Sequence, residues 1–271
     1  MDRMFPAIVA LLVLLVLPHV AHAGYVLVDN TGEQTLVSRG RLKFVPKETD
    51  EPTLVLDLAR ARMWISDPRR RTFWEGTVDE YCTGVRAMMG GGIAGVEQQM
   101  KEQMAGMSPA EREQMQKMLD AMKGGGRPSG GAPRKVTVER GARDEPVAGL
   151  SARRYRVLAD GKLYEELWLT TDPAFVRELD LARTPETFGR MRACLVGASA
   201  HGAGDSVEES AEYRALFQQG WLLRSVNHGA GGAGGRSTVK VEARDIPDAQ
   251  FAPPPGFRRA PLAEVFGGDQ R

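Results

Sequence analysis

SARRYRVLADGKLYEELWLTT, residues 151–171, is the stretch that decides the fold class. Apolar and polar residues alternate through much of it, on both sides of Asp160-Gly161, a dipeptide that favours a two-residue turn between antiparallel strands. The stretch therefore predicts a β-hairpin. Because a two-residue turn can join only antiparallel neighbours, we expect an antiparallel sheet around it.

Residues 24–77 show a similar β pattern. YVLV, QTLVSRGRLKFV and TLVLDL are separated by polar turn segments, and RMWISDPRRRTFW predicts a hairpin of residues 63–66 against 72–74. Alternation of period two with turn signals at short intervals is typical of an antiparallel meander. We expect one face of this meander to lie in solvent.

Helix signals interrupt the strands. Residues 77–80 and 108–111 each fit a capping box, and Thr171-Asp172-Pro173 opens a helical region to about residue 196, with a break at 184–185. Another helix is expected around 208–218, and strands return at 135–140, 221–226 and 237–246. The sequence therefore predicts an α+β fold, a curved antiparallel sheet with helices packed on one face.

The first 23 residues predict export. An apolar run from Ala7 to Leu17 ends at Pro18, and Ala21-His22-Ala23 has the small residues that a signal peptidase needs. The run is shorter than the roughly 20 apolar residues of a membrane-spanning helix. We expect a cleaved signal peptide at 1–23 and a periplasmic or secreted protein without a transmembrane span in the mature chain.

Residues 24–271 are expected to form one domain. Its predicted parts include a Met-rich helical insertion at 78–123 and flexible Gly-rich linkers at 124–134 and 229–236. The whole chain carries 36 basic and 35 acidic residues. Such a balance argues against a nucleic-acid partner, because proteins that bind nucleic acids usually carry an excess of basic residues.

Cys82 and Cys194 are the two cysteines of the chain. In an oxidising compartment a lone pair of cysteines is more often bonded than free, which predicts a disulfide. In the chain-entropy model, closing a loop of this length stabilises the fold by roughly 4–5 kcal/mol. The alternative is a pair of buried thiols that act as small apolar side chains.

The order of motifs is similar to that of a bacterial envelope family, domain of unknown function 4412. LVLDLARARMWISDPRRRTFWE (54–75) resembles its central strand and basic hairpin, and VAGLSARRYRVLADGKLYEELWLTTDP (147–173) resembles its later hairpin. The Met-rich segment 107–122 and FAPPPGFRR (251–259) resemble its helical insertion and its closing end. The resemblance implies the half-barrel of the periplasmic lipoprotein carriers, and it supplies no catalytic residues.

Motifs for catalysis and metal binding do not stand out. The sequence has no G-x-S-x-G elbow, no H-E-x-x-H and no phosphate loop. His201 and His228 lie in Gly-rich loops, and we expect them to be solvated. Glu165 and Glu166 are adjacent on a predicted strand and point to opposite faces. We therefore expect a non-enzymatic protein with no catalytic residue, no metal site and no cofactor.

Methionines are the most unusual feature of the insertion. Two trios step along a helix by three and four residues, so each trio lies on one helical face: Met100, Met104 and Met107, then Met115, Met118 and Met122. Packing onto the sheet is the commonest use of such a stripe. An adaptable surface for a lipid or a partner and a Cu(I) site are the alternatives.

These observations lead to one functional hypothesis and one alternative. The first is a carrier-like protein that holds a lipid, or a lipoprotein acyl chain, against the methionines and against Trp64, Trp74 and Trp168. The alternative is a structural envelope protein whose Met-rich helix docks on an envelope protein partner.

Overall fold

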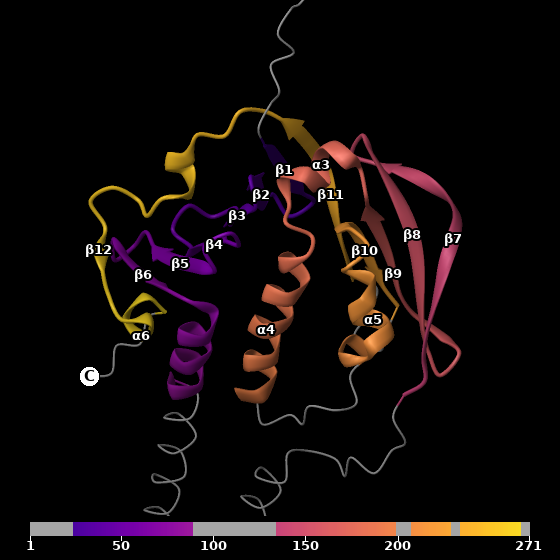
Figure 1. The fold of residues 1–271 in the computed structure, drawn as a ribbon. Helices are drawn as coiled ribbons and strands as arrows, with labels where there is room; N and C mark the ends of the chain where they lie inside the picture. Colours follow the sequence, from indigo (N-terminus) through magenta and orange to yellow (C-terminus); the bar gives the residue numbers. More distant parts are fainter. Residues whose placement is uncertain (1–23, 89–133, 199–206, 229–233, 267–271) are drawn as a thin grey trace, which may run out of the picture.

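The computed structural model describes residues 24–88, 134–198, 207–228 and 234–266 of the 271-residue chain. Within these ranges, twelve strands form one sheet, and helices lie beside it (Figure 1). The predicted methionine trios fall between 89 and 133, outside the described residues.

The first six strands follow one another along residues 25–76. Short turns join them, and every consecutive pair is antiparallel, as the alternation predicts. A helix over residues 78–88 follows the last of them. The strands are β1 (Tyr25–Asp29), β2 (Gln34–Ser38), β3 (Arg41–Val45), β4 (Thr53–Asp57), β5 (Arg62–Asp67) and β6 (Thr72–Gly76).

The second half of the chain supplies six further strands and most of the helices. The strands are β7 (Val136–Val147), β8 (Leu150–Ala159), β9 (Lys162–Thr170), β10 (Trp221–Asn227), β11 (Gly234–Ala243) and β12 (Arg258–Arg259). The helices are α3 (Pro173–Glu178), α4 (Arg183–Ala198), α5 (Ala211–Leu216) and α6 (Leu262–Val265), with short 3₁₀ turns η2 (Val207–Glu209) and η3 (Asp248–Phe251). β11 begins within the range that was predicted as a linker.

The predicted hairpin is β8 and β9. Asp160 and Gly161 have φ of 51° and 76°, the left-handed backbone that a two-residue hairpin turn of this type requires. The pairing continues from Ala159 opposite Lys162 to Ala152 opposite Thr170. The prediction from residues 151–171 is confirmed.

The two halves of the chain meet at two places in the sheet, where β1 pairs with β11 and where β12 pairs with β6. The strand order is β12-β6-β5-β4-β3-β2-β1-β11-β10-β9-β8-β7, and all neighbours are antiparallel except β12 with β6. The sheet is not closed and is not strongly curled. The predicted α+β architecture with a large antiparallel sheet is confirmed at this level.

The inner face of β1–β6 is the one that packs against helices. Val37, Leu42 and Met63 are 0% exposed there, and residues of the 78–88 helix, α3, α4 and α6 join the same core. The strand register explains why these side chains share one face. Val37 lies opposite Leu42, and the residues that lie directly opposite one another on the following strands point to the same side of the sheet. This face is the main core of the described protein.

The outer face of the same strands is also covered, so the prediction that one face lies in solvent is wrong. Val26, Leu36, Val55 and Trp64 form a second buried cluster with side chains of the chain segment that follows β11. We call residues 244–257 the C-terminal strap; its Ile246 and Phe251 are 2% exposed. Strand alternation alone does not show which distant segment covers a face.

The 78–88 helix and α4 lie side by side in Figure 1. A disulfide joins Cys82 to Cys194, with their Cα atoms 5.3 Å apart, and Arg190 pairs with Asp79. The predicted disulfide is thus confirmed. So is the capping box, since Thr77 N–H donates to Glu80 and Glu80 N–H donates to Thr77 Oγ1 at 3.2 Å.

Three local predictions need correction. The break in the helical region falls between α3 and α4, at 179–182, and Pro185 sits in the first turn of α4, where a proline is tolerated. β7 runs to Val147 rather than stopping at 140, because an irregularity between Arg140 and Asp144 lets the pairing resume. β12 and α6 were not predicted, because two- and four-residue elements carry too little periodicity.

Candidate functional site

A partly exposed aromatic zone lies at one side of the inner core. In the row Val37, Leu42 and Leu56, the side chains are at most 1% exposed, whereas Phe44, Leu54 and Trp74 in the next row are only partly buried. Phe188 of α4 and Trp221 of β10 are partly buried against the same core. We call Phe44, Leu54, Trp74, Phe188 and Trp221 the aromatic margin.

Ring contacts join three members of the aromatic margin. The ring centroids of Phe44 and Phe188 are 5.9 Å apart, and those of Phe188 and Trp221 are 6.4 Å apart, both with edge-on geometry. α4 thus links the N-terminal strands to β10 through one phenylalanine. Trp74 lies against Tyr81 of the neighbouring helix, with centroids 6.2 Å apart.

The three tryptophans predicted as candidate site residues are not brought together. Trp74 belongs to the aromatic margin, but Trp64 is on the outer face, because it and Trp74 lie on opposite sides of the β5–β6 pair. Trp168 of β9 has its own surroundings. Its indole N–H donates to Glu145 at 2.9 Å, and the guanidinium groups of Arg154 and Arg224 lie 5.4 and 4.5 Å from its ring.

Of the aromatic margin, only Trp74 was predicted as a site residue, and four further residues complete it. Phe44, Phe188 and Trp221 are separated by more than 30 residues from one another, and each looks like an ordinary apolar residue of its own element. Only the packing of α4 across the sheet makes them neighbours. The disulfide at Cys194, in the same helix, fixes that packing.

A partly buried group of acids and phenols lies beneath α5. Tyr213 donates to Glu165 at 2.8 Å, Tyr164 donates to Glu208, and Arg192 of α4 lies 3.6 Å from Glu208. Burial raises the pKa of Glu165, and burial together with the neighbouring Glu208 raises the pKa of Tyr164 to about 12. These groups hold η2 and α5 against β9.

Glu166 behaves differently from its neighbour. It accepts from Arg154 and lies 3.1 Å from the His228 ring, so the prediction that the two adjacent glutamates do not converge is confirmed. Burial acts to raise the pKa of Glu166, but hydrogen bonds from Arg154 and His228 lower it overall. His228 is exposed, as the sequence predicts, and its ring also contacts Glu166.

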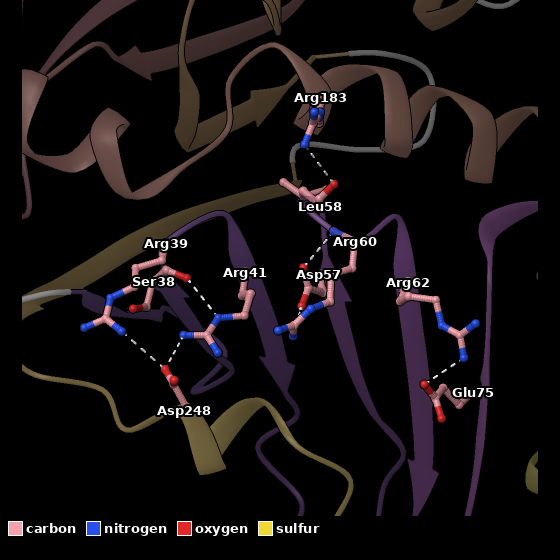
Figure 2. A network of polar contacts seen from close by, with 10 residues as sticks. All are labelled: Ser38, Arg39, Arg41, Asp57, Leu58, Arg60, Arg62, Glu75, Arg183 and Asp248. Carbon is pink, nitrogen blue, oxygen red and sulfur yellow. Dashed lines mark hydrogen bonds and ion pairs between the residues drawn. The ribbon is translucent and has the colours of Figure 1, made fainter.

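Arginines on the outer face fasten the C-terminal strap (Figure 2). Arg41 lies 2.6 Å from Asp248 and 4.5 Å from the centre of the Phe251 ring. In the same view Arg60 pairs with Asp57 at 3.0 Å and Arg62 with Glu75 at 2.8 Å. The network pairs charges within the fold.

The arginines of the basic turn between β5 and β6 also form ion pairs within the fold. Arg69 pairs with Asp50, and Arg70 pairs with Asp67 at 2.8 Å. These contacts hold a β-turn, and they do not gather the guanidinium groups around an open position.

The described ranges contain no group of three or more His, Cys, Asp or Glu side chains arranged to hold a metal ion. Within those same ranges no helix is long and apolar enough to cross a membrane. No protein-family model matches the chain, and no curated protein matches it either.

Proposed function

We propose that this chain is an exported, non-enzymatic envelope protein that binds the acyl chain of a lipid or of a lipoprotein at the aromatic margin. The proposal includes the signal peptide at 1–23, a periplasmic or secreted location, and the carrier-type half-barrel that the resemblance to domain of unknown function 4412 implies. The single observation that carries it is the partly exposed aromatic margin beside a fully buried core.

The chemistry of the margin suits an acyl chain. Its five side chains offer apolar contact from three parts of the fold: β3, β4 and β6, then α4, then β10. Burying apolar surface stabilises a complex by about 0.8 kcal/mol per methylene group, so an alkyl chain gains affinity in proportion to the length it buries. Flat aromatic rings also impose little side-chain entropy cost on binding.

A neutral fluorescent probe tests the proposal. N-phenyl-1-naphthylamine brightens in apolar sites, and we expect it to bind the mature protein and to be displaced by a long-chain alcohol. Phe188→Gln keeps a good helix former in α4 and should weaken probe binding at least fivefold. The matched control is Phe266→Gln, because Phe266 is 47% exposed and lies outside the aromatic margin.

The proposal fails if both variants bind the probe as the parent does, or if the parent binds none. Trp221→Gln serves as a second margin variant in case Phe188→Gln unfolds. Thermal unfolding of every variant shows whether a loss of binding reflects a loss of fold.

The completely buried row beside the margin favours a second candidate function. Val37, Leu42 and Met63 leave no exposed apolar surface in that part of the core. A protein with a filled interior would use its surface, including the Met-rich segment, to dock on an envelope partner. Absence of probe binding together with specific cross-linking to one envelope protein would support this function instead.

A further inference from the structure

Arg224 of β10 lies beside the aromatic margin on the same face of the sheet. Trp221 of the margin lies opposite Thr170 of β9. Arg224 lies opposite Trp168, two residues earlier on β9. Residues two apart on a strand point to the same side, so Trp221 and Arg224 both lie on the inner face, about 7 Å apart along the sheet.

An irregularity in β10 gives Arg224 this direction. The register shifts between Leu222 and Arg224, so β10 carries one residue more than β9 at this point. In an uninterrupted strand, residues three apart point to opposite faces, and Arg224 would point away from Trp221. Bulges of this kind often redirect a side chain next to a functional site.

Trp168 holds the guanidinium group of Arg224. The guanidinium carbon lies 4.5 Å from the centre of the indole ring, and that of Arg154, on the other neighbouring strand, lies 5.4 Å from it. The indole is itself fixed, because its N–H donates to Glu145 at 2.9 Å. Stacking uses the flat face of a guanidinium group, so the N–H groups at its edge stay available as donors.

The two arginines beside Trp168 differ in their partners. Arg154 pairs with Glu166. Arg224 is exposed, and within the described ranges its guanidinium group has no hydrogen bond and no ion pair. Glu145 lies at the edge of the indole ring, where it accepts from the N–H, and not over the face where Arg224 lies. The donors of Arg224 are therefore free for an anionic group from outside the fold.

We propose that the acyl chain bound at the aromatic margin carries an anionic head group, a carboxylate or a phosphate, and that Arg224 binds this group. The inference rests on the proposed acyl binding and names the class of ligand. A carboxylate or a phosphate accepts two parallel hydrogen bonds from the edge of one guanidinium group. With its head group at Arg224, the alkyl chain runs over Trp221 towards Phe188, whose ring centroid is 6.4 Å from that of Trp221.

Isothermal titration with ligands of equal chain length separates the contribution of the head group from that of the chain. We expect decanoate and decyl phosphate to bind the mature protein roughly tenfold more tightly than decanol, because only the two anions form charge-assisted hydrogen bonds with Arg224. The tighter of the two anions identifies the head group as a carboxylate or a phosphate.

Arg224→Met keeps an unbranched apolar stem and removes the guanidinium group. It should weaken both anions roughly tenfold and leave decanol unchanged, because decanol uses only the apolar margin. Arg224→Lys, which restores the charge, should bind the anions more tightly than Arg224→Met. The matched control is Arg214→Met, because Arg214 is an exposed arginine of α5 outside the margin, and it should change none of the three affinities.

Equal affinity of the parent for decanol and for both anions would overturn this inference and leave the acyl proposal standing. A preference for the anions that persists in a folded Arg224→Met variant would also overturn it. Binding of none of the three ligands to the parent would overturn both proposals.

Discussion

The two faces of β1–β6 are built from the same six strands but are covered in different ways. Helices cover the inner face, and a disulfide fastens two of them together. A chain segment with one short 3₁₀ turn covers the outer face, and arginine contacts such as Arg41 with Asp248 fasten it. The inner face therefore has the deeper core, and the outer face depends on the strap for its cover.

The largest expected effect comes from removing the covalent link on the inner side. A double variant, Cys82→Ala with Cys194→Ala, should lower the free energy of unfolding by about 4 kcal/mol, because the bond closes a loop with a sequence separation of 112. Guanidinium unfolding of the oxidised parent and of the variant measures the difference. A loss below about 1 kcal/mol would show that the helix layer is held by packing alone.

Matched leucine truncations compare the two coverings directly. Leu42→Ala on the inner face should cost about 4 kcal/mol, because Leu42 is 0% exposed among rigid helices and strands. Leu36→Ala on the outer face, where the residue is 6% exposed, should cost about 2 kcal/mol, because the strap can settle into the space. Urea unfolding measures both, and an equal or reversed order would contradict the comparison.

Neighbouring glutamates on β9 extend the comparison to pH. Burial raises the pKa of Glu165 in the folded protein, so the folded state binds more protons than the unfolded state between the ordinary carboxyl pKa and the raised one. The stability that this residue contributes is present below that window and is lost as pH rises through it. The groups that face it are the neutral phenol of Tyr213, the carboxyl group of Glu208 and the guanidinium of Arg192.

Glu165→Gln should remove this pH dependence, which unfolding measured at several pH values from acid to neutral would show. Glu166→Gln is the control with the opposite sign, because its pKa is lowered and its stabilisation is lost as pH falls. Parallel pH profiles for the parent and Glu165→Gln would refute the assignment.

The smallest effect is expected at the strap. Asp248 is 70% exposed in its side chain, so Asp248→Asn should produce only a slight loss of stability that vanishes in high salt. Hydrogen exchange of residues 244–252 should nevertheless accelerate in low salt, because Arg41 loses its partner. Unchanged exchange would mean that Phe251 and Ile246 hold the strap without help from charge.

Local chemistry was sufficient to predict much of this fold. Asp160-Gly161 located the hairpin, and the capping box at 77–80 located the start of a helix. The buried outer face also had a signal, since YVLV and TLVL are apolar at consecutive positions and not only at alternate ones. That signal does not identify the covering segment.

The candidate sites were harder to predict because they depend on distant packing. Phe44 and Phe188 meet through α4, and Ile246 reaches the outer cluster through the strap. Arg224 looks like an ordinary polar residue in WLLRSVN until the irregularity in β10 turns it to the face of Trp221. Trp64 and Trp74 were both predicted as site residues, and the register of β5 with β6 places them on opposite faces of the sheet.

Native mass spectrometry of residues 24–271, purified from a periplasmic extract without detergent, tests the central claim most directly. Acyl-chain binding predicts an added mass that is released as lipid on denaturation and is reduced in Phe188→Gln but not in Phe266→Gln. A bare protein mass, two hydrogens below that of the reduced chain, would confirm the disulfide and contradict the acyl-carrier proposal. An added copper mass would contradict it as well and would favour the thioether hypothesis for the methionines.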